Sequence, residues 1–509
     1  MFKNWLFGRG QGQSRTRRQR SVPVVSWVEA LENRTLLATL VSPVKLTYQD
    51  GDDVAVTFSK PILNAANVNS VFQFNSGSVN GSNNSPQQLR QINLVGVAGA
   101  AGTTITTVSI RSAVRGGDGF AALGSIDATD LDLGAVTIDG DLGRILAGDA
   151  NSVTQGVGAL KAQSMGRFGT VTGAADLHSV ILGRLSSLTL KTDLKGAFVE
   201  VIGDANGTIG SVTIGGSIIG MSAFNSGRVS SSGNMGAVIV SGDVRGGAGT
   251  QSGLIGSYHD IASVTIGGSV IGGSSAFAGC ILTDFLGGGP DVGGAGGHIG
   301  AVKITGDLLG GSNTGAGSII SESGKLASVT IGGSVLAGSG DRSAHIHSDM
   351  DMGAVSITGN VVGGGGIMSG EIESIGKMAS VTIGGPLKGG AGDGSGSILS
   401  NFDLGAAKIA GDIVGGGGTS SEQLTTLGKL ASATIGGSVR GDTGNTSGAV
   451  FRSWPANVEH VSNMRVVLSF EHDEIVLHES FTDRLHRHDI GFSTSGCSTS
   501  GCPRRVGRV

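Results

Sequence analysis

The feature that most constrains this chain is a segment that recurs about every 26 residues between positions 209 and 441. The first copy reads Ile209-Gly-Ser-Val-Thr-Ile-Gly-Gly-Ser-Ile-Ile-Gly220. Nine copies begin at positions 209, 235, 261, 299, 326, 352, 378, 404 and 430. One step is longer because it holds an insertion of 12 residues within about 284–297. A fixed period of this length indicates a repeat fold in which each unit packs on its neighbours.

Apolar residues occupy fixed positions of the repeat. The fourth and sixth positions carry Val, Ile or Ala, and they share one face of a strand because side chains alternate with period two. The tenth position is apolar again, and the eighth is always glycine, from Gly216 to Gly437. We expect that glycine to turn a corner with φ angles that other residues avoid. A further apolar column precedes several units: Ile255, Ile320, Ile346, Ile372, Ile398 and Leu424.

These columns predict an all-β fold, a parallel β-helix with three short strands in each coil of about 26 residues. Coils of this kind stack about 4.8 Å apart. The third position alternates Ser and Ala from unit to unit, so the true period is a pair of coils, or 52 residues.

Charged residues precede most units: Asp260, His298, Lys325, Asp351, Lys377, Asp403 and Lys429. Stacked coils would place opposite charges side by side as an axial ladder. Exposed pairs are each worth about 0–1 kcal/mol, but a slip by one coil would bring like charges together. We interpret the ladder as a control of register.

Composition excludes several classes of protein. Gly numbers 93 and Pro only 8, with no Gly at every third position, so the chain is not collagen. The net charge of −4 gives no reason to expect nucleic acid as a partner. Three Cys in 509 residues do not make a disulfide framework. The sequence has no run of 18 apolar residues, so we expect no membrane span.

The sequence divides into five segments. Residues 1–40 are a basic export or targeting segment, and 41–113 are a small antiparallel β-sandwich-like domain with a hairpin around Asp50-Gly51. Irregular solenoid coils follow over 114–208, and the regular coils cover 209–450. Residues 451–509 form a divergent tail rich in His, which we interpret as a partial cap or a disordered segment.

The amino-terminal segment carries a recognisable motif. Residues 31–38 read Leu-Glu-Asn-Arg-Thr-Leu-Leu-Ala and follow a stretch with six basic residues and no acidic one. They resemble the LEPR-XLL segment near the start of large surface proteins of planctomycete bacteria, with Asn33 in place of the family's proline. The resemblance covers about 2% of the chain. It implies export to the cell surface or the extracellular space.

Two groups of residues have the chemistry of metal ligands. The loop with Asp50, Asp52 and Asp53 offers carboxylate oxygens, which calcium prefers.

In the segment 345–351, strand alternation would place His345, His347, Asp349 and Asp351 on one outward face, opposite Ile346, where zinc is the alternative to a solvated polar surface. We expect a solvated face, and therefore no metal and no cofactor, at both places.

Two functions remain from different classes. The first is a glycine-rich, secreted, adhesin-like structural protein of the cell surface, with extracellular matrix, glycan or cell-envelope components as partners. The second is a carbohydrate-active β-helix enzyme, a polysaccharide lyase or hydrolase. An enzyme needs clustered carboxylates, whereas Asp243, Asp307 and Asp412 recur by period and lie at least two coils apart. The sequence therefore favours a rod without a catalytic site.

Overall fold

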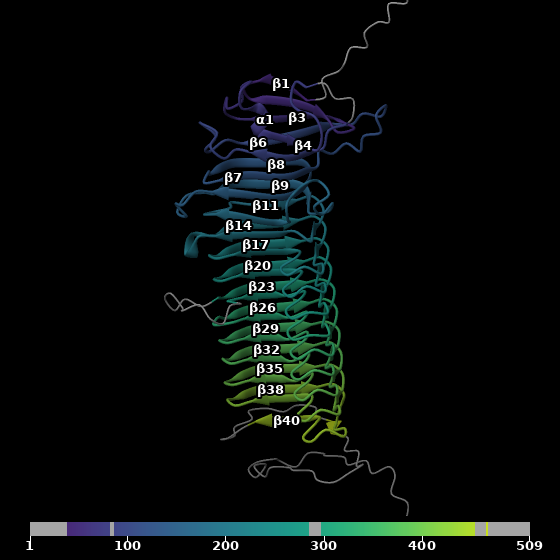
Figure 1. Ribbon diagram of the computed structural model, residues 1–509. Coiled ribbons are helices and arrows are strands. Elements are labelled where there is room, and N and C mark those ends of the chain that lie inside the picture. The colour runs from purple at the N-terminus through teal and green to yellow at the C-terminus, as the bar shows by residue number, and fades with distance from the viewer. Residues whose placement is uncertain (1–37, 82–85, 285–296, 453–464, 467–509) are drawn as a thin grey trace, which may run out of the picture.

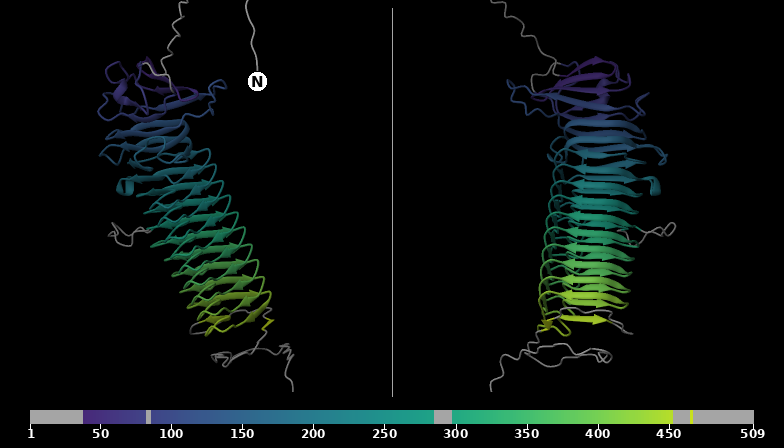
Figure 2. Two further views of the ribbon diagram at one scale, coloured as in Figure 1. Left: turned by 45° about the vertical axis from the view of Figure 1, so that its right-hand side comes forward. Right: turned by 180° about the vertical axis from the view of Figure 1, so that it is seen from behind.

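The structure is a computed structural model that describes residues 38–81, 86–284, 297–452 and 465–466. It is a long rod of short parallel strands, capped at the amino-terminal end by an antiparallel part (Figures 1 and 2). Helix is confined, in these residues, to α1 (Val68–Val71) and one short 3₁₀ turn, Asp204–Asn206. The prediction of an all-β parallel solenoid is confirmed.

Each regular coil contains three strands. The first begins at the start of a repeat unit and is six residues long; these strands are β14 (Ile209–Ile214), β17 (Met235–Val240), β20 (Ile261–Ile266), β23 (Ile299–Ile304), β26 (Leu326–Ile331), β29 (Met352–Ile357), β32 (Met378–Ile383), β35 (Leu404–Ile409) and β38 (Leu430–Ile435). The second strands are β15 (Ile218–Ile219), β18 (Val244–Arg245), β21 (Val270–Ile271), β24 (Leu308–Leu309), β27 (Val335–Leu336), β30 (Val361–Val362), β33 (Leu387–Lys388), β36 (Ile413–Val414) and β39 (Ser438–Arg440). The third strands are β16 (Arg228–Ser231), β19 (Leu254–Ser257), β22 (Ile281–Thr283), β25 (Ile319–Ser321), β28 (Ile346–Ser348), β31 (Ile372–Ser374), β34 (Ile398–Ser400), β37 (Gln423–Thr426) and β40 (Ala449–Arg452).

Every strand pairs in parallel with its equivalent in the next coil, which stacks like residues into columns. In one coil the fourth, sixth and tenth positions are Val329, Ile331 and Val335, and all three are fully buried. The register also holds across the insertion, because Ile261 pairs with Ile299 and Ile266 with Ile304. The apolar columns therefore form one continuous core, as the period predicts.

One member of the third apolar column was predicted wrongly. Ile319, and not Ile320, stacks between Ile281 and Ile346 inside the coil. The spacing to the next unit is 27 residues here, and the extra residue lies in the turn after Ser321, so counting back from the unit start misses by one. Ile320 faces outward and packs in a small apolar cluster with Leu254, Cys280 and Leu282.

The reason given for the eighth-position glycine was also wrong. None of these glycines has a positive φ. They are needed because neighbouring coils touch there: a methyl group on Gly333 would overlap the carboxylate of Asp307 in the preceding coil. Positive φ angles recur instead in the loop before the third strand, for example at Gly370 and Gly396, and at Ala344 and Glu422.

A column of buried hydroxyl groups runs through the interior beside the third strands. Its members are Ser231, Ser257, Thr283, Ser321, Ser348, Ser374, Ser400 and Thr426. The hydroxyl of Ser348 donates to the carbonyl of Gly324 at 3.0 Å, and that of Ser374 donates to the carbonyl of Met350 at 2.9 Å. Each such bond ties a turn of the preceding coil to the next strand, which satisfies polar groups that burial would otherwise leave unpaired.

The coils before residue 209 follow the same plan with longer strands: β7 (Leu123–Thr129), β8 (Leu133–Gly148), β9 (Val157–Met165), β10 (His178–Leu182), β11 (Leu188–Leu190), β12 (Leu194–Lys195) and β13 (Phe198–Ile202). At the other end, β41 (Arg465–Val466) pairs with β39.

The amino-terminal part contains β1 (Thr39–Ser42), β2 (Lys45–Gln49), β3 (Asp53–Phe58), β4 (Phe72–Phe74), β5 (Leu89–Asn93) and β6 (Ile105–Ile110). Strands β1, β2, β3 and β6 pair antiparallel in that order, and β4 pairs antiparallel with β5. The hairpin predicted around Asp50 and Gly51 is β2–β3. Because β5 and β6 pair in parallel with β7 and β8, this part covers the first coil and shares its core.

Candidate functional site

The site with the most chemistry lies on the outer face of two neighbouring third strands, β28 and β31. Ile346 pairs with Ile372, and both point into the core. Strand alternation therefore turns His347 and Glu373, which also pair, to the outside. His345 and Glu371 precede the two strands and lie on the same outer side.

This outer face is not exposed to solvent as the sequence predicted. His345 has a side-chain exposure of 2% and Glu371 of 5%. The outer column two residues earlier is buried in other coils as well, because the loop before each third strand packs over it; Phe277 from such a loop covers Cys280. The prediction that His345 lies on a solvated face is therefore wrong, and the loop is the physical reason.

The ring nitrogens and carboxylates converge. His347 Nδ1 lies 2.9 Å from Glu373 Oε2, and His345 Nε2 lies 3.4 Å from the same oxygen. The two rings are 5.2 Å apart between centroids. Glu371 Oε2 lies 3.8 Å from His345 Nε2, and both atoms are buried without a hydrogen bond. One face of two coils thus holds two imidazoles and two carboxylates.

Two further groups hold this cluster from outside. Asp349 accepts a hydrogen bond at 2.8 Å from His347 Nε2, and its side chain is 42% exposed. The hydroxyl of Ser397 donates to Glu371 Oε1 at 2.9 Å. Asp349 is thus brought together with His347 as the sequence suggested. Asp351 is not, because its side chain belongs to the charge ladder.

Burial sets the protonation of the cluster. Burial lowers the pKa of His345 to about 4. Burial and the negative charge of Glu373 raise the pKa of Glu371 to about 8. Burial alone would raise the pKa of Glu373, but the two imidazoles beside it hold that pKa well below its usual range. Burial would lower the pKa of His347, yet its hydrogen bonds to Glu373 and Asp349 outweigh burial and raise the pKa.

Reasoning from one strand missed Glu371 and Glu373. The signal was present in the repeat, because 26 residues after His345 and His347 come these two glutamates. Adding the period to each candidate would have identified them.

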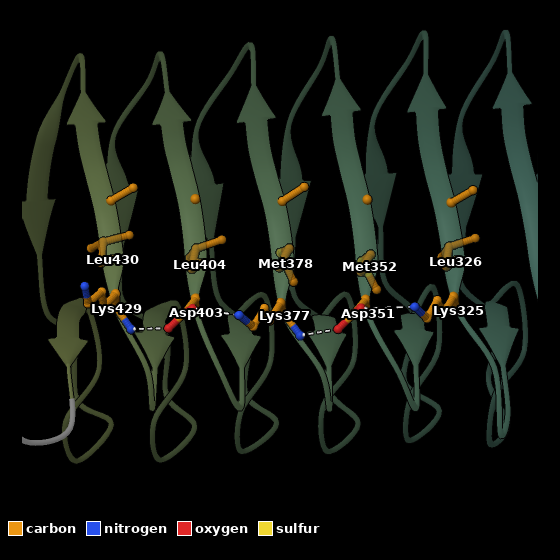
Figure 3. Close-up of a pocket in the computed structure, with 15 residues that line it drawn as sticks. Lys325, Leu326, Asp351, Met352, Lys377, Met378, Asp403, Leu404, Lys429 and Leu430 are labelled. Atoms are coloured by element: carbon orange, nitrogen blue, oxygen red, sulfur yellow. Dashed lines mark hydrogen bonds and ion pairs between the residues drawn. The ribbon is translucent and has the colours of Figure 1, made fainter.

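The charge ladder runs along a groove at the beginning of the first strands (Figure 3). Lys325 Nζ lies 3.3 Å from Asp351 Oδ2, and Lys377 Nζ lies 3.1 Å from Asp403 Oδ2. The other oxygen of each aspartate accepts the backbone N–H of the next coil, at 3.1 Å from Lys377 and 3.0 Å from Lys429. Figure 3 shows these side chains in one line across successive coils. The groove has a volume of about 640 Å³, and small residues such as Ala327 and Gly353 line it.

The periodic aspartates weighed as catalytic groups are engaged in structural bonds. Asp243 Oδ1 accepts the N–H of Ser269 at 2.8 Å, and Asp307 Oδ1 accepts the N–H of Ser334 at 2.7 Å. Asp412 accepts the N–H of Ser438 in the same way at 2.7 Å. These carboxylates act as pegs between coils.

The acidic loop considered for calcium is likewise engaged. Asp52 is buried and accepts the backbone N–H groups of Ser112 at 2.8 Å and Gly119 at 2.7 Å. Asp53 forms an ion pair with Arg115 at 2.6 Å. Burial raises the pKa of Asp50 to about 6. Among the described residues, the three carboxylates do not meet at one point, whereas His345, His347 and Glu373 do.

Residues 31–37 of the LEPR-XLL-like motif and the histidines and Cys497 and Cys502 of the tail lie outside the described residues. Over the ranges that the structure describes, no helix has the length and apolar character needed to cross a membrane.

Comparison with known proteins gives no assignment. No family model, no curated protein and no solved structure matches this chain. Function is therefore argued from the chain itself.

Proposed function

We propose that this chain is an exported, adhesin-like structural protein of the cell surface, in which a β-solenoid rod carries repetitive polar faces and no catalytic site. The observation that carries the proposal is the periodic use of charge. The aspartates along the rod bond to backbone N–H groups or to lysines of the neighbouring coil, so they stabilise the stacking of coils. A glycan-cleaving site needs free carboxylates gathered in one groove.

The outer face of the first strands is suited to contact with a partner. Its fifth-position column is in register from coil to coil and exposed along nearly its whole length: Thr213, Ile239, Thr265, Lys303, Thr330, Ser356, Thr382, Lys408 and Thr434. Hydroxyl and ammonium groups at a regular spacing of about 4.8 Å suit a repetitive partner such as a polysaccharide or a cell-envelope polymer. Export itself rests on the resemblance of residues 31–38.

The test combines location and activity. Antibody labelling of intact producing cells should reach the protein, and the purified chain should bind cell-envelope glycans without shortening them. Replacement of Lys303 and Lys408 by Gln should weaken retention on acidic glycans, whereas Lys45→Gln in the amino-terminal part should not. Clear turnover of any polysaccharide on the panel would favour the carbohydrate-active alternative instead, and a protein found only inside intact cells would refute export.

A further inference from the structure

We propose that His345, His347, Glu373 and Glu371 form a binding site for a divalent transition metal, with Zn²⁺ as the best match. This inference is independent of the surface function proposed above. It also departs from the expectation of a solvated polar face.

The first argument is convergence. One ligand atom from each of His345, His347 and Glu373 can be chosen so that all lie within 4.8 Å of one another. A metal with bonds of about 2.0–2.2 Å to nitrogen and oxygen holds its ligand atoms at mutual distances of this order. Glu371 Oε2, 3.8 Å from His345 Nε2, completes a set of four.

The second argument is the pair of unpartnered polar atoms. His345 Nε2 and Glu371 Oε2 are buried, point toward each other and make no hydrogen bond. Buried polar groups nearly always have a partner. A cation between these two atoms would supply it for both.

The third argument is the outer ring of contacts. A histidine that binds metal through one nitrogen usually donates its other N–H to a carboxylate, which fixes the ring and its tautomer. His347 has this arrangement, with Nδ1 facing Glu373 and Nε2 donating to Asp349. Ser397 orients Glu371 through its hydroxyl group.

The ligand types identify the metal. Two imidazoles with carboxylates suit Zn²⁺ and its neighbours, whereas Ca²⁺ and Mg²⁺ take oxygen ligands almost exclusively. The ligands come from two adjacent coils, so a bound metal would clamp β28 to β31 from the outside.

The same rod offers a matched control. His178 and Glu200 lie on the outer face of β10 and β13, with Nε2 and Oε2 2.8 Å apart, but no second histidine lies beside them within the described residues. The metal hypothesis therefore predicts that His178→Gln leaves binding unchanged.

The experiment measures Zn²⁺ and Co²⁺ binding to the full chain after removal of metal with a chelator. Because the tail contains five more histidines, the readout is the difference between variants. Wild type should bind one more equivalent of Zn²⁺ than His347→Gln or Glu373→Gln, or bind it at least about 100-fold more tightly. Asp349→Asn, outside the ligand set, should weaken binding by about 10–100-fold. Zn²⁺ should raise the melting temperature of wild type and of His178→Gln, and Co²⁺ should show visible absorption typical of a four-coordinate site in both.

Equal stoichiometry and affinity in wild type, His347→Gln and Glu373→Gln would overturn the proposal. If either ligand variant fails to fold, the partly exposed Asp349 provides the comparison, and unchanged Zn²⁺ affinity in Asp349→Asn together with no Co²⁺ spectrum in wild type would overturn it equally.

Discussion

Single glycines and carboxylates decide how closely neighbouring coils approach. At the eighth position the absent side chain leaves room for the acceptor at the ninth position of the preceding coil, as Gly333 does for Asp307. At the third strands, buried hydroxyls join one coil to the next. The residue scale therefore contains mostly contacts between coils, and contacts within a coil matter less.

Gly333→Ala should lower the free energy of unfolding by about 1–3 kcal/mol, because the new methyl group overlaps a carboxylate that Ser334 holds in place. Gly365→Ala is the control, since its nearest atom would be 3.8 Å away and its φ is not positive. That variant should be neutral or gain about 0.4–1 kcal/mol. Thermal and denaturant unfolding measure both, and equal losses in the two variants would show that the close approach is unimportant.

Glu422 predicts a pH effect of known sign. Burial raises the pKa of this side chain to about 8, whereas an unfolded glutamate titrates near about 4.3. Between these values the unfolded state has lost the proton that the folded state keeps, so stability falls as pH rises through this window. Below about pH 4 the effect is absent. The melting temperature of wild type should therefore drop from pH 5 to pH 8 by more than that of Glu422→Gln, and parallel curves would contradict the assignment.

At the scale of the element, the two ladders of charged side chains differ in strength. The groove ladder uses exposed ion pairs, with side-chain exposures of 63% for Lys377 and 47% for Asp403. The ninth-position pegs bond backbone N–H groups that lie between coils. Stacking should thus depend more on the pegs than on the ladder that is conspicuous in the sequence.

Lys377→Ala should cost about 0–1 kcal/mol and less at high salt. Asp307→Ala should cost about 1.5–3 kcal/mol, because it removes a charge-assisted hydrogen bond and leaves the N–H of Ser334 without its acceptor. Unfolding in urea at low and high salt measures the two. A larger loss for Lys377→Ala would reverse the order of the ladders.

The elements also show what a sequence reveals about such a fold. The inward columns and the register across the insertion were predictable, because Val329 and Ile331 repeat with the period of the coil. The burial of His345 was not, because it depends on a loop whose conformation uses positive φ at Ala344, a residue that gives no local sign of it. Ile320 was misplaced by a single extra residue in a turn. Period thus predicts columns, whereas loops decide which outer side chains are covered.

At the scale of the whole molecule, the rod behaves as a stack of paired coils. The ladder alternates Lys and Asp, the ninth position alternates acceptors, and the second position alternates Ala and Gly. The last alternation is steric: a methyl group on Gly353 would overlap the carbonyl oxygen of Ala327. Each coil is therefore complementary to the next and unlike it.

This complementarity predicts that a shorter rod can be the more stable one. Deletion of residues 352–403 removes two coils, places Asp351 beside Lys429 and stacks Gly405 on Ala327, so every alternation survives. Deletion of residues 352–377 removes one coil, places Asp351 beside Asp403 and stacks Ala379 on Ala327. Both deletions remove Glu371 and Glu373, so the histidine cluster is disturbed equally.

The two-coil deletion should shorten the rod by about 10 Å and unfold in one cooperative transition, as measured by small-angle scattering and calorimetry. The one-coil deletion should melt at a lower temperature although it buries more apolar surface. High salt should recover only the electrostatic part of the difference, because screening relieves the like charges and leaves the steric overlap. If the longer variant melts at the higher temperature in low and high salt, the unit of stacking is the single coil and the alternations have no energetic weight.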